Sequence, residues 1–177
     1  MRVLLVTDGI YPFVMGGMQK HSYYLGKFLA RKGIRVCLVH CAPDLSPGQE
    51  FSLPEFSGFD AVNITFKSLP FPVSARLPGH YLRESKRYST NVYEHVKAQL
   101  DGFDLVYCQG FTGWAFIRAR RCGELRAPVL SNLHGYEMFQ LAPSFRTRLF
   151  RGPMRRLARR ISLGSDAVFS FGGRITE

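Results

Sequence analysis

Two glycines and two histidines are the residues whose types and spacing could do chemistry in this chain. Gly16 and Gly17 lack Cβ atoms, so they can take positive φ and let another molecule approach the main chain. Free N–H groups where a helix starts carry partial positive charge, which suits a phosphate. The alternative is that the pair only turns the chain and packs a helix on a strand, because no Gly-x-Gly-x-x-Gly or Walker sequence accompanies it.

His134 belongs to a set of polar and glycine positions that follow predicted strands. Asp8 and Gly9 follow the first strand, and Gln109 and Gly110 follow another. The carboxyl ends of parallel strands meet at one edge of a sheet, so we expect these segments to converge. An imidazole there could donate a hydrogen bond to a sugar hydroxyl or to developing charge, whereas a lone histidine that ends a strand is otherwise structural.

Short apolar runs alternate with segments of helical periodicity. The resulting strands and helices must position the glycines and histidines described above. We expect strands over 2–7, 34–40, 61–66, 104–108, 128–133 and 165–170. We expect helices that end at Gly33 and that span 79–100, 114–122 and 153–161. The alternation predicts an α/β fold, a Rossmann-like, doubly wound, mostly parallel sheet with helices on both faces.

Two of these helices carry apolar stripes that we expect to face the sheet. The stripe of the first helix is Tyr24, Leu25, Phe28 and Leu29, and that of the second is Tyr81, Tyr88, Val92, Val96 and Leu100. Between strands, 41–59 is rich in Pro, Ser and Gly and 69–78 in prolines, so both are predicted as loops.

Length and composition predict a single domain over residues 1–177. With 177 residues and 46% apolar content, the chain can bury a core without disulfides or metals. The four cysteines form no Cys-x-x-Cys pair, so we expect buried reduced thiols, as in a cytoplasmic protein. No secretory leader or spanning segment is evident, which leaves a soluble protein or one attached to the inner face of a membrane.

A net charge of +11 indicates an anionic partner, for which a nucleotide sugar, an anionic lipid and nucleic acid all qualify. Seven arginines and no acidic residue lie between Glu137 and Asp166. Gly152-Pro153 suits a helix start, after which an apolar face (Met154, Leu157, Ala158 and Ile161) opposes Arg155, Arg156, Arg159 and Arg160. This basic helix is either a solvated helix packed on the sheet or a contact for anionic lipid. Nucleic acid is not expected, since no aromatic interleaving or nucleic-acid motif is present.

The start of the chain resembles glycosyltransferase family 4. The resemblance lies in Tyr11-Pro12, in Gly16-Gly17-x-x-x-His21 and in Lys32-Gly33-Ile34-Arg35-Val36. Members of that family have the GT-B fold, two Rossmann-like domains that face each other across a cleft. This sequence is similar to the N-terminal, acceptor-side domain along its whole length, so the resemblance implies that the C-terminal, donor-binding domain is absent from this chain.

The resemblance also implies roles for individual residues. His134, in His134-Gly135-x-Glu137, matches the histidine beside the transferred sugar and would be catalytic. Gly16 and Gly17 match a turn near the donor phosphates and the acceptor, and His21 matches a histidine that either packs or contacts phosphate. Together with Gln109, Gly110 and Glu137 these are the predicted substrate-binding residues.

The implied reaction is a retaining transfer of a sugar, of the hexosyltransferase type, from a nucleotide sugar to the hydroxyl of a sugar or a lipid-linked acceptor. Synthesis of a cell-surface polysaccharide or glycolipid is the expected setting, with no cofactor or essential metal, and the isolated domain is expected to be inactive. The alternative is a non-catalytic basic module that binds anionic membrane or nucleic acid. A dinucleotide oxidoreductase is disfavoured by the missing Gly-x-Gly-x-x-Gly.

Overall fold

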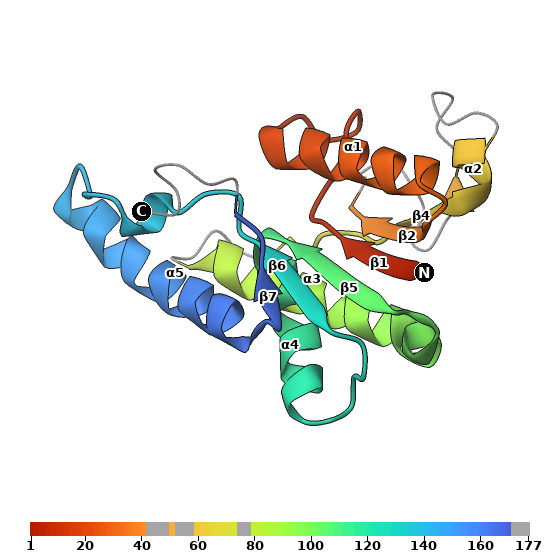
Figure 1. Ribbon diagram of the computed structural model, residues 1–177. Coiled ribbons are helices and arrows are strands. Elements are labelled where there is room, and N and C mark those ends of the chain that lie inside the picture. The colour runs from red at the N-terminus through yellow and green to blue at the C-terminus, as the bar shows by residue number, and fades with distance from the viewer. Residues whose placement is uncertain (42–49, 52–58, 74–78, 171–177) are drawn as a thin grey trace.

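The computed structural model describes residues 1–41, 50–51, 59–73 and 79–170, with the backbone alone described at 50–51, 59–60, 137 and 146. Within these residues a seven-stranded sheet has the order β3-β4-β2-β1-β5-β6-β7 (Figure 1). All neighbours pair in parallel except β3, which is antiparallel to β4. The strands are β1 (Arg2–Val6), β2 (Arg35–His40), β3 (Glu50–Phe51), β4 (Ile64–Ser68), β5 (Leu105–Gln109), β6 (Val129–Asn132) and β7 (Ala167–Val168).

Helices cover both faces of this sheet. Figure 1 shows α1 on one face and α3, α4 and α5 on the other. The α-helices are α1 (Gly17–Arg31), α2 (Phe59–Asn63), α3 (His80–Val96), α4 (Trp114–Arg121) and α5 (Phe145–Gly164). The 3-10 helices are η1 (Lys97–Gly102), η2 (Gly110–Gly113) and η3 (Glu137–Phe139). The predicted fold class, a doubly wound and mostly parallel α/β sheet, is confirmed.

Alternate residues of β1 belong to two separate apolar clusters. Val3 and Leu5 pack in one cluster with Tyr23 of α1. Leu4 and Val6 pack in the other cluster with side chains from α3, α4 and α5. A strand buried on both faces must be apolar at every position, which is why β1 shows no alternation of apolar and polar residues.

The strand order reverses at β1, which pairs with β2 on one side and with β5 on the other. A doubly wound sheet leaves a crevice outside the carboxyl ends of its strands at such a switch point. Ligands collect there because helix N-termini and strand ends supply backbone polar groups without a secondary-structure partner. The fold therefore directs attention to the residues that follow β1 and β5.

Helix α1 contacts the sheet with small residues rather than with all of the predicted apolar stripe. Tyr24 and Phe28 are 59% and 57% exposed. Ser22, Gly26 and Ala30, spaced four apart, are buried instead. A Cβ atom on Gly26 would come within 3.1 and 3.2 Å of side chains on β4 and β2. The helix lies this close because small side chains form the stripe that faces the strands, and the prediction for Tyr24 and Phe28 was wrong.

The strand predicted over 61–66 begins later than expected. Helix α2 occupies the first half of that segment, and β4 starts at Ile64. The side chain of Asn63 donates to the carbonyl of Ala30, 3.2 Å away, near the end of α1. This contact favours a turn of helix before the strand, although the β-branched residues alone indicated strand throughout. The loops predicted at 41–59 and 69–78 lie largely outside the described residues, which include only 41, 50–51 (β3), 59 and 69–73 of these segments.

Helix α5 begins eight residues before the predicted start at Pro153. Ser144 caps it, since its side chain accepts a hydrogen bond from the amide of Thr147 at 3.2 Å. Pro153 lies inside the helix on the exposed side, where its missing N–H removes one helical hydrogen bond without burying an unpaired group. The predicted inner face is confirmed, with Leu157, Ala158 and Ile161 buried. The last predicted strand, 165–170, is only the two residues of β7.

Smaller differences concern α3 and the cysteines. Tyr81 is 40% exposed, whereas the rest of the predicted stripe on α3 and η1 is buried. None of the four cysteines forms a disulfide. Cys122 is exposed, and the other three are buried. Among the described helices, none combines the length and apolar composition of a membrane-spanning segment.

The contact between the end of α5 and α4 generates a stability prediction. A Cβ atom on Gly164 would lie 2.5 Å from the Cγ2 atom of Ile117, which is buried. Gly164→Ala should therefore lower the free energy of unfolding by about 1–3 kcal/mol, the usual cost of overpacking. Chemical denaturation measures the change.

Leu163→Ala is the matched control, because Leu163 is 87% exposed in the same turn. That substitution should change the free energy of unfolding by no more than about 0.5 kcal/mol. Equal stability of Gly164→Ala and the parent protein would contradict the close packing of α4 and α5.

Candidate functional site

The candidate site lies at the carboxyl edge of the sheet, where three segments meet. Gln109 ends β5 and is fully buried. His134 follows β6, the neighbour of β5 in the sheet, and His21 lies about one turn into α1. These three residues were predicted separately from the sequence, and the structure brings their side chains together.

The amide of Gln109 bridges the two imidazole rings. Its Nε2 atom is 3.0 Å from Nδ1 of His21, and its Oε1 atom is hydrogen-bonded to Nε2 of His134. The two rings lie edge to face, with centroids 4.9 Å apart and planes at 71°. One buried side chain thus fixes the orientation of both histidines.

These hydrogen bonds determine which ring nitrogens carry protons. An amide oxygen only accepts, so Nε2 of His134 donates to Gln109 and Nδ1 of that neutral ring is an acceptor. The amide nitrogen only donates, so Nδ1 of His21 accepts and its proton sits on Nε2. The sequence-based expectation gave His134 a proton to donate to a sugar hydroxyl, but that proton is engaged with Gln109. A sugar hydroxyl at Nδ1 of His134 would therefore donate the hydrogen bond and the ring would accept it.

Both imidazoles are held in the neutral form. Burial, and to a smaller extent the neighbouring His21, lower the pKa of His134 to about 4. Burial also lowers the pKa of His21. Two rings in contact would repel each other if both were protonated, so neutrality and the amide bridge support one another.

The backbone at His134 adopts a conformation that side chains other than glycine rarely take. Its φ is 60°, in the left-handed region. The amide of His134 donates to the side chain of Asn132 at 2.9 Å, and the amide of Gly135 donates to the carbonyl of Leu133 at 2.7 Å. These two bonds close a tight turn that aims the ring, at a backbone cost of about 1 kcal/mol.

Asn132 is therefore a positioning residue that the sequence analysis missed. Its side chain also donates to the hydroxyl of Tyr107 at 3.4 Å, on the adjacent strand. The available signal was an asparagine two residues before the histidine, since Asx side chains commonly bind the backbone two residues on.

Gly16 and Gly17 form an open start to α1. Neither glycine adopts the left-handed conformation. Gly16 has an extended backbone, with φ 171°, and α1 begins at Gly17. The first helical bond runs from the amide of Lys20 to the carbonyl of Gly16 at 3.0 Å, so the amides of 17–19 precede the intrahelical ladder. A Cβ atom on Gly17 would meet nothing within 4 Å. Gly17 therefore leaves one side of the helix N-terminus open, whereas the side chain of Gln19 lies against Gly16, where a Cβ atom would clash with its Oε1 atom.

Gly110 is the position where a positive φ is used. Its φ is 59°, and a Cβ atom there would lie 3.3 Å from the sulfur of Met18 in the first turn of α1. Glycine at 110 therefore lets the end of β5 lie against the start of α1, which brings the glycine pair and the histidine pair to the same edge.

Asp8 is the carboxylate at this edge. It follows β1 and accepts a hydrogen bond from the side chain of Gln19 at 3.3 Å. Burial raises its pKa to about 6, while the Gln19 hydrogen bond lowers it. At neutral pH the side chain is mostly ionised, and its contact with Gln19 links the end of β1 to the first turn of α1.

The chain after His134 is held by arginines of α5. Arg155 donates from Nε to the carbonyl of Met138, and Arg151 donates to the carbonyl of Gln140 at 2.9 Å. The guanidinium groups of Arg155 and Arg159 each lie 5.9 Å from the ring centre of Phe139. Arg155 and Arg159, two of the four arginines predicted as lipid contacts, thus pack against η3. The backbone of Glu137 begins η3, and its side chain lies outside the described part of the structure.

Metal binding at this edge finds no support in the geometry. Among the described residues, no group of three His, Cys, Asp or Glu side chains is arranged to hold a metal ion. The arrangement instead offers an open helix N-terminus for an anion and, beside it, two neutral imidazoles for hydroxyl groups.

The sequence and the fold were compared with known proteins. The model of Glycosyltransferase Family 4 matches residues 15–170. Among curated proteins, none matches the chain. A sucrose-phosphate synthase from Thermosynechococcus elongatus has a TM-score of 0.67 and 14% identity, covering 94% of this chain and 41% of that one.

Two further similar structures contain ligands. An α,α-trehalose-phosphate synthase (UDP-forming) from Burkholderia xenovorans in complex with glucose-6-phosphate has a TM-score of 0.56 and 16% identity, covering 95% of this chain and 40% of that one. A UGT transferase from Siraitia grosvenorii in complex with UDP has a TM-score of 0.51 and 15% identity, covering 73% and 27%. At these identities the similarity concerns the fold, and the present chain spans less than half the length of each.

The neutral state of His134 generates a prediction about pH. As the pH falls from about 6.5 towards 4, the unfolded chain takes up a proton on this residue that the folded chain does not. The free energy of unfolding should therefore fall with the pH over this range. His134→Asn should reduce the steepness of that fall, and asparagine tolerates the left-handed backbone. Denaturation at several pH values measures both slopes.

Buried groups that do not contact His134 contribute to both proteins alike and cancel in the comparison, whereas the contribution of His21, which touches His134, can change with the substitution. Burial lowers the pKa of His40 to about 4, which adds to the fall, and the raised pKa of Asp8 opposes it. Identical slopes for the parent protein and His134→Asn would show that His134 titrates alike in the folded and unfolded chain, against this account.

Proposed function

The chain belongs to glycosyltransferase family 4, and we propose that it forms the N-terminal domain of an enzyme that transfers a sugar from a nucleotide-sugar donor to an acceptor hydroxyl. The observation that carries the proposal is the placement of the His21–Gln109–His134 bridge beside the open N-terminus of α1. The helix start complements a phosphate and the histidine bridge complements a sugar, and the two share one edge of the sheet.

The start of α1 takes the phosphate role in this proposal. The amides of 17–19 and the helix dipole would stabilise the negative charge that develops as the nucleoside diphosphate leaves. No acidic side chain lies in the first turn of α1, where the uncharged side chain of Gln19 lies against Gly16.

His134 takes the sugar role. Its ring is aimed by the tight turn at 134 and locked by Gln109, so it can orient a hydroxyl of the transferred sugar without losing side-chain freedom on binding. His21, on α1, binds the other end of the Gln109 amide. The proposed reaction is a retaining transfer of the hexosyltransferase type, and we assign no nucleophilic carboxylate in this domain.

A second domain is part of the proposal. The chain covers 41% of the sucrose-phosphate synthase and 40% of the trehalose-phosphate synthase, whose described partner is glucose-6-phosphate. We propose that a donor-binding domain faces this carboxyl edge in the complete enzyme. The N-terminal domain described here would be inactive without it. The donor would be a nucleoside-diphosphate sugar such as a UDP-sugar, by analogy with the UDP-bound neighbour. No metal or cofactor takes part in the proposed reaction.

The acceptor would be a sugar or a lipid-linked sugar, in the synthesis of a cell-surface polysaccharide or glycolipid at the cytoplasmic side of a membrane. The basic character of the chain is compatible with a donor and an acceptor that both carry phosphate. Comparing transfer to membrane lipid acceptors with transfer to soluble sugar acceptors tests this setting.

Gly17→Asp tests the proposal in the complete enzyme. A side chain fits at 17 without contacts, and an acidic residue at a helix start stabilises the helix, so folding should be preserved. The added negative charge should repel the donor phosphates and lower kcat/KM for the nucleotide sugar by on the order of tenfold or more. Transfer from a panel of labelled nucleotide sugars to membrane lipid and soluble sugar acceptors measures it.

Gly17→Asn is the matched control, because it adds a side chain of the same shape without the charge. It should retain most of the activity. Equal losses in the two variants would assign the effect to bulk, and equal activities would place the donor phosphates away from α1.

A further inference from the structure

The outward face of α5 carries a regular set of exposed side chains. Phe145, Leu149, Arg156, Arg160 and Leu163 are spaced at intervals of three, four and seven residues, which places them on one side of the helix. This side is opposite the buried residues that pack α5 on the sheet. The three apolar members are 82%, 67% and 87% exposed, in chain order. We call these five residues the outer face of α5.

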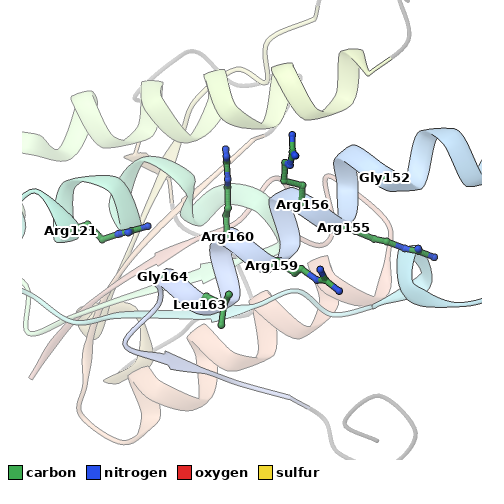
Figure 2. Close-up of a pocket in the computed structure, with 8 residues that line it drawn as sticks. All are labelled: Arg121, Gly152, Arg155, Arg156, Arg159, Arg160, Leu163 and Gly164. Atoms are coloured by element: carbon green, nitrogen blue, oxygen red, sulfur yellow. The ribbon is translucent and has the colours of Figure 1, made fainter.

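The arginines of the outer face line two hollows. One, of about 560 Å³ between α3 and α5, is lined by Lys86, Arg156 and Arg160 over an apolar floor that includes Leu157. The other, shown in Figure 2, is lined by Arg121 of α4 and by Arg155, Arg156, Arg159 and Arg160 of α5. In Figure 2, Arg156 and Arg160 extend to the same side of the helix, whereas Arg155 extends towards η3. No carboxylate is among the residues that line either hollow.

This concentration of positive charge calls for an anionic partner. Repulsion among Lys86, Arg156 and Arg160 is unfavourable unless anions reduce it, and the flexible side chains leave room for bound phosphate groups. Arg151 and Arg155 have internal roles at η3, but that role does not extend to Arg156 and Arg160, which are exposed on the other side.

The apolar residues of the outer face indicate which anion is bound. The N-terminal half of α5 extends beyond the body of the domain in Figure 1, and Leu141, just before it, is 98% exposed. Large apolar side chains next to arginines are typical of helices that lie in a membrane interface, with the apolar groups among the lipids and the cations at the headgroups. A nucleic acid would use the arginines but would have no place for exposed aliphatic side chains.

We propose that the outer face of α5 docks this domain on an anionic lipid surface. Phe145 and Leu149 enter the interfacial layer, and Arg156, Arg160 and Lys86 bind headgroup phosphates. The docking does not depend on the proposed sugar transfer. Helices of a parallel α/β sheet start at the carboxyl edge of the strands, so the start of α5 and the candidate site lie at the same edge of the domain.

Co-sedimentation with vesicles tests this docking. The protein should bind vesicles of phosphatidylcholine containing about 30 mol % phosphatidylglycerol and should not bind pure phosphatidylcholine. Arg156→Gln combined with Arg160→Gln should weaken binding roughly 30-fold, since each basic residue near such a surface contributes about 1 kcal/mol. Phe145→Ala combined with Leu149→Ala should weaken it by on the order of tenfold through lost apolar burial.

Lys32→Gln combined with Arg35→Gln is the charge-matched control, because these exposed cations lie at the amino edge of the sheet. It should change binding by less than about twofold, because charges beyond a Debye length of about 10 Å are screened. Circular dichroism and thermal melting verify that each variant is folded, and the emission of Trp114, which lies under Lys86, provides a second binding signal.

Three results would overturn the proposal. Equal binding to neutral and anionic vesicles would exclude headgroup recognition. Equal weakening by the outer-face and control substitutions would reduce the effect to net charge. Effective competition by a single-stranded oligonucleotide, with no effect of the Phe145 and Leu149 substitutions, would identify nucleic acid as the ligand.

Discussion

The buried amide of Gln109 is the constraint on which the candidate site depends. A side-chain amide excluded from water must form its hydrogen bonds within the protein, or folding loses the free energy of its hydration. Both ends of this amide are used by imidazoles, one from α1 and one from the loop after β6. Satisfying one polar group therefore ties three separate segments together at the switch point of the sheet.

The rest of the domain supports this bridge from two sides. Asn132 fixes the backbone of His134, and the contacts of Arg155 and Arg151 hold the chain that follows. On the other side, Gly110 lets the start of α1 lie against the end of β5. Helix α5 contributes through Arg151 and Arg155, which stabilise the chain after the candidate catalytic histidine, while its outer face is exposed.

The sequence predicted the fold class and the convergence of Gln109 and His134, because parallel strands place their carboxyl ends at one edge whatever the details of packing. It singled out His21 through the family resemblance alone and did not predict that His21 contacts the other two. It failed where two local signals competed. Pro153 indicated a helix start, although Ser144 already provided a cap. Tyr24 and Phe28 indicated the inner face of α1, although the small residues beside them pack closer to the strands.

Other features were beyond any reading of the chain. The tautomers of His21 and His134 follow from the orientation of a single amide, and the role of Arg155 follows from a contact between segments far apart in sequence. Such contacts have no local pattern, so periodicity and motif spacing cannot indicate them. The same holds for the division of the α5 arginines into inner and outer sets, which depends on where η3 lies.

The most direct test of the account is a histidine-ring NMR titration of the protein, with assignments from single substitutions. The account predicts that both His21 and His134 titrate below their ordinary pKa of 6.5, His134 at about 4, and that Gln109→Leu changes the ring-nitrogen signals of both together. A His134 ring that titrates near 6.5, with signals indifferent to Gln109→Leu, would contradict the claim that one buried amide assembles this site.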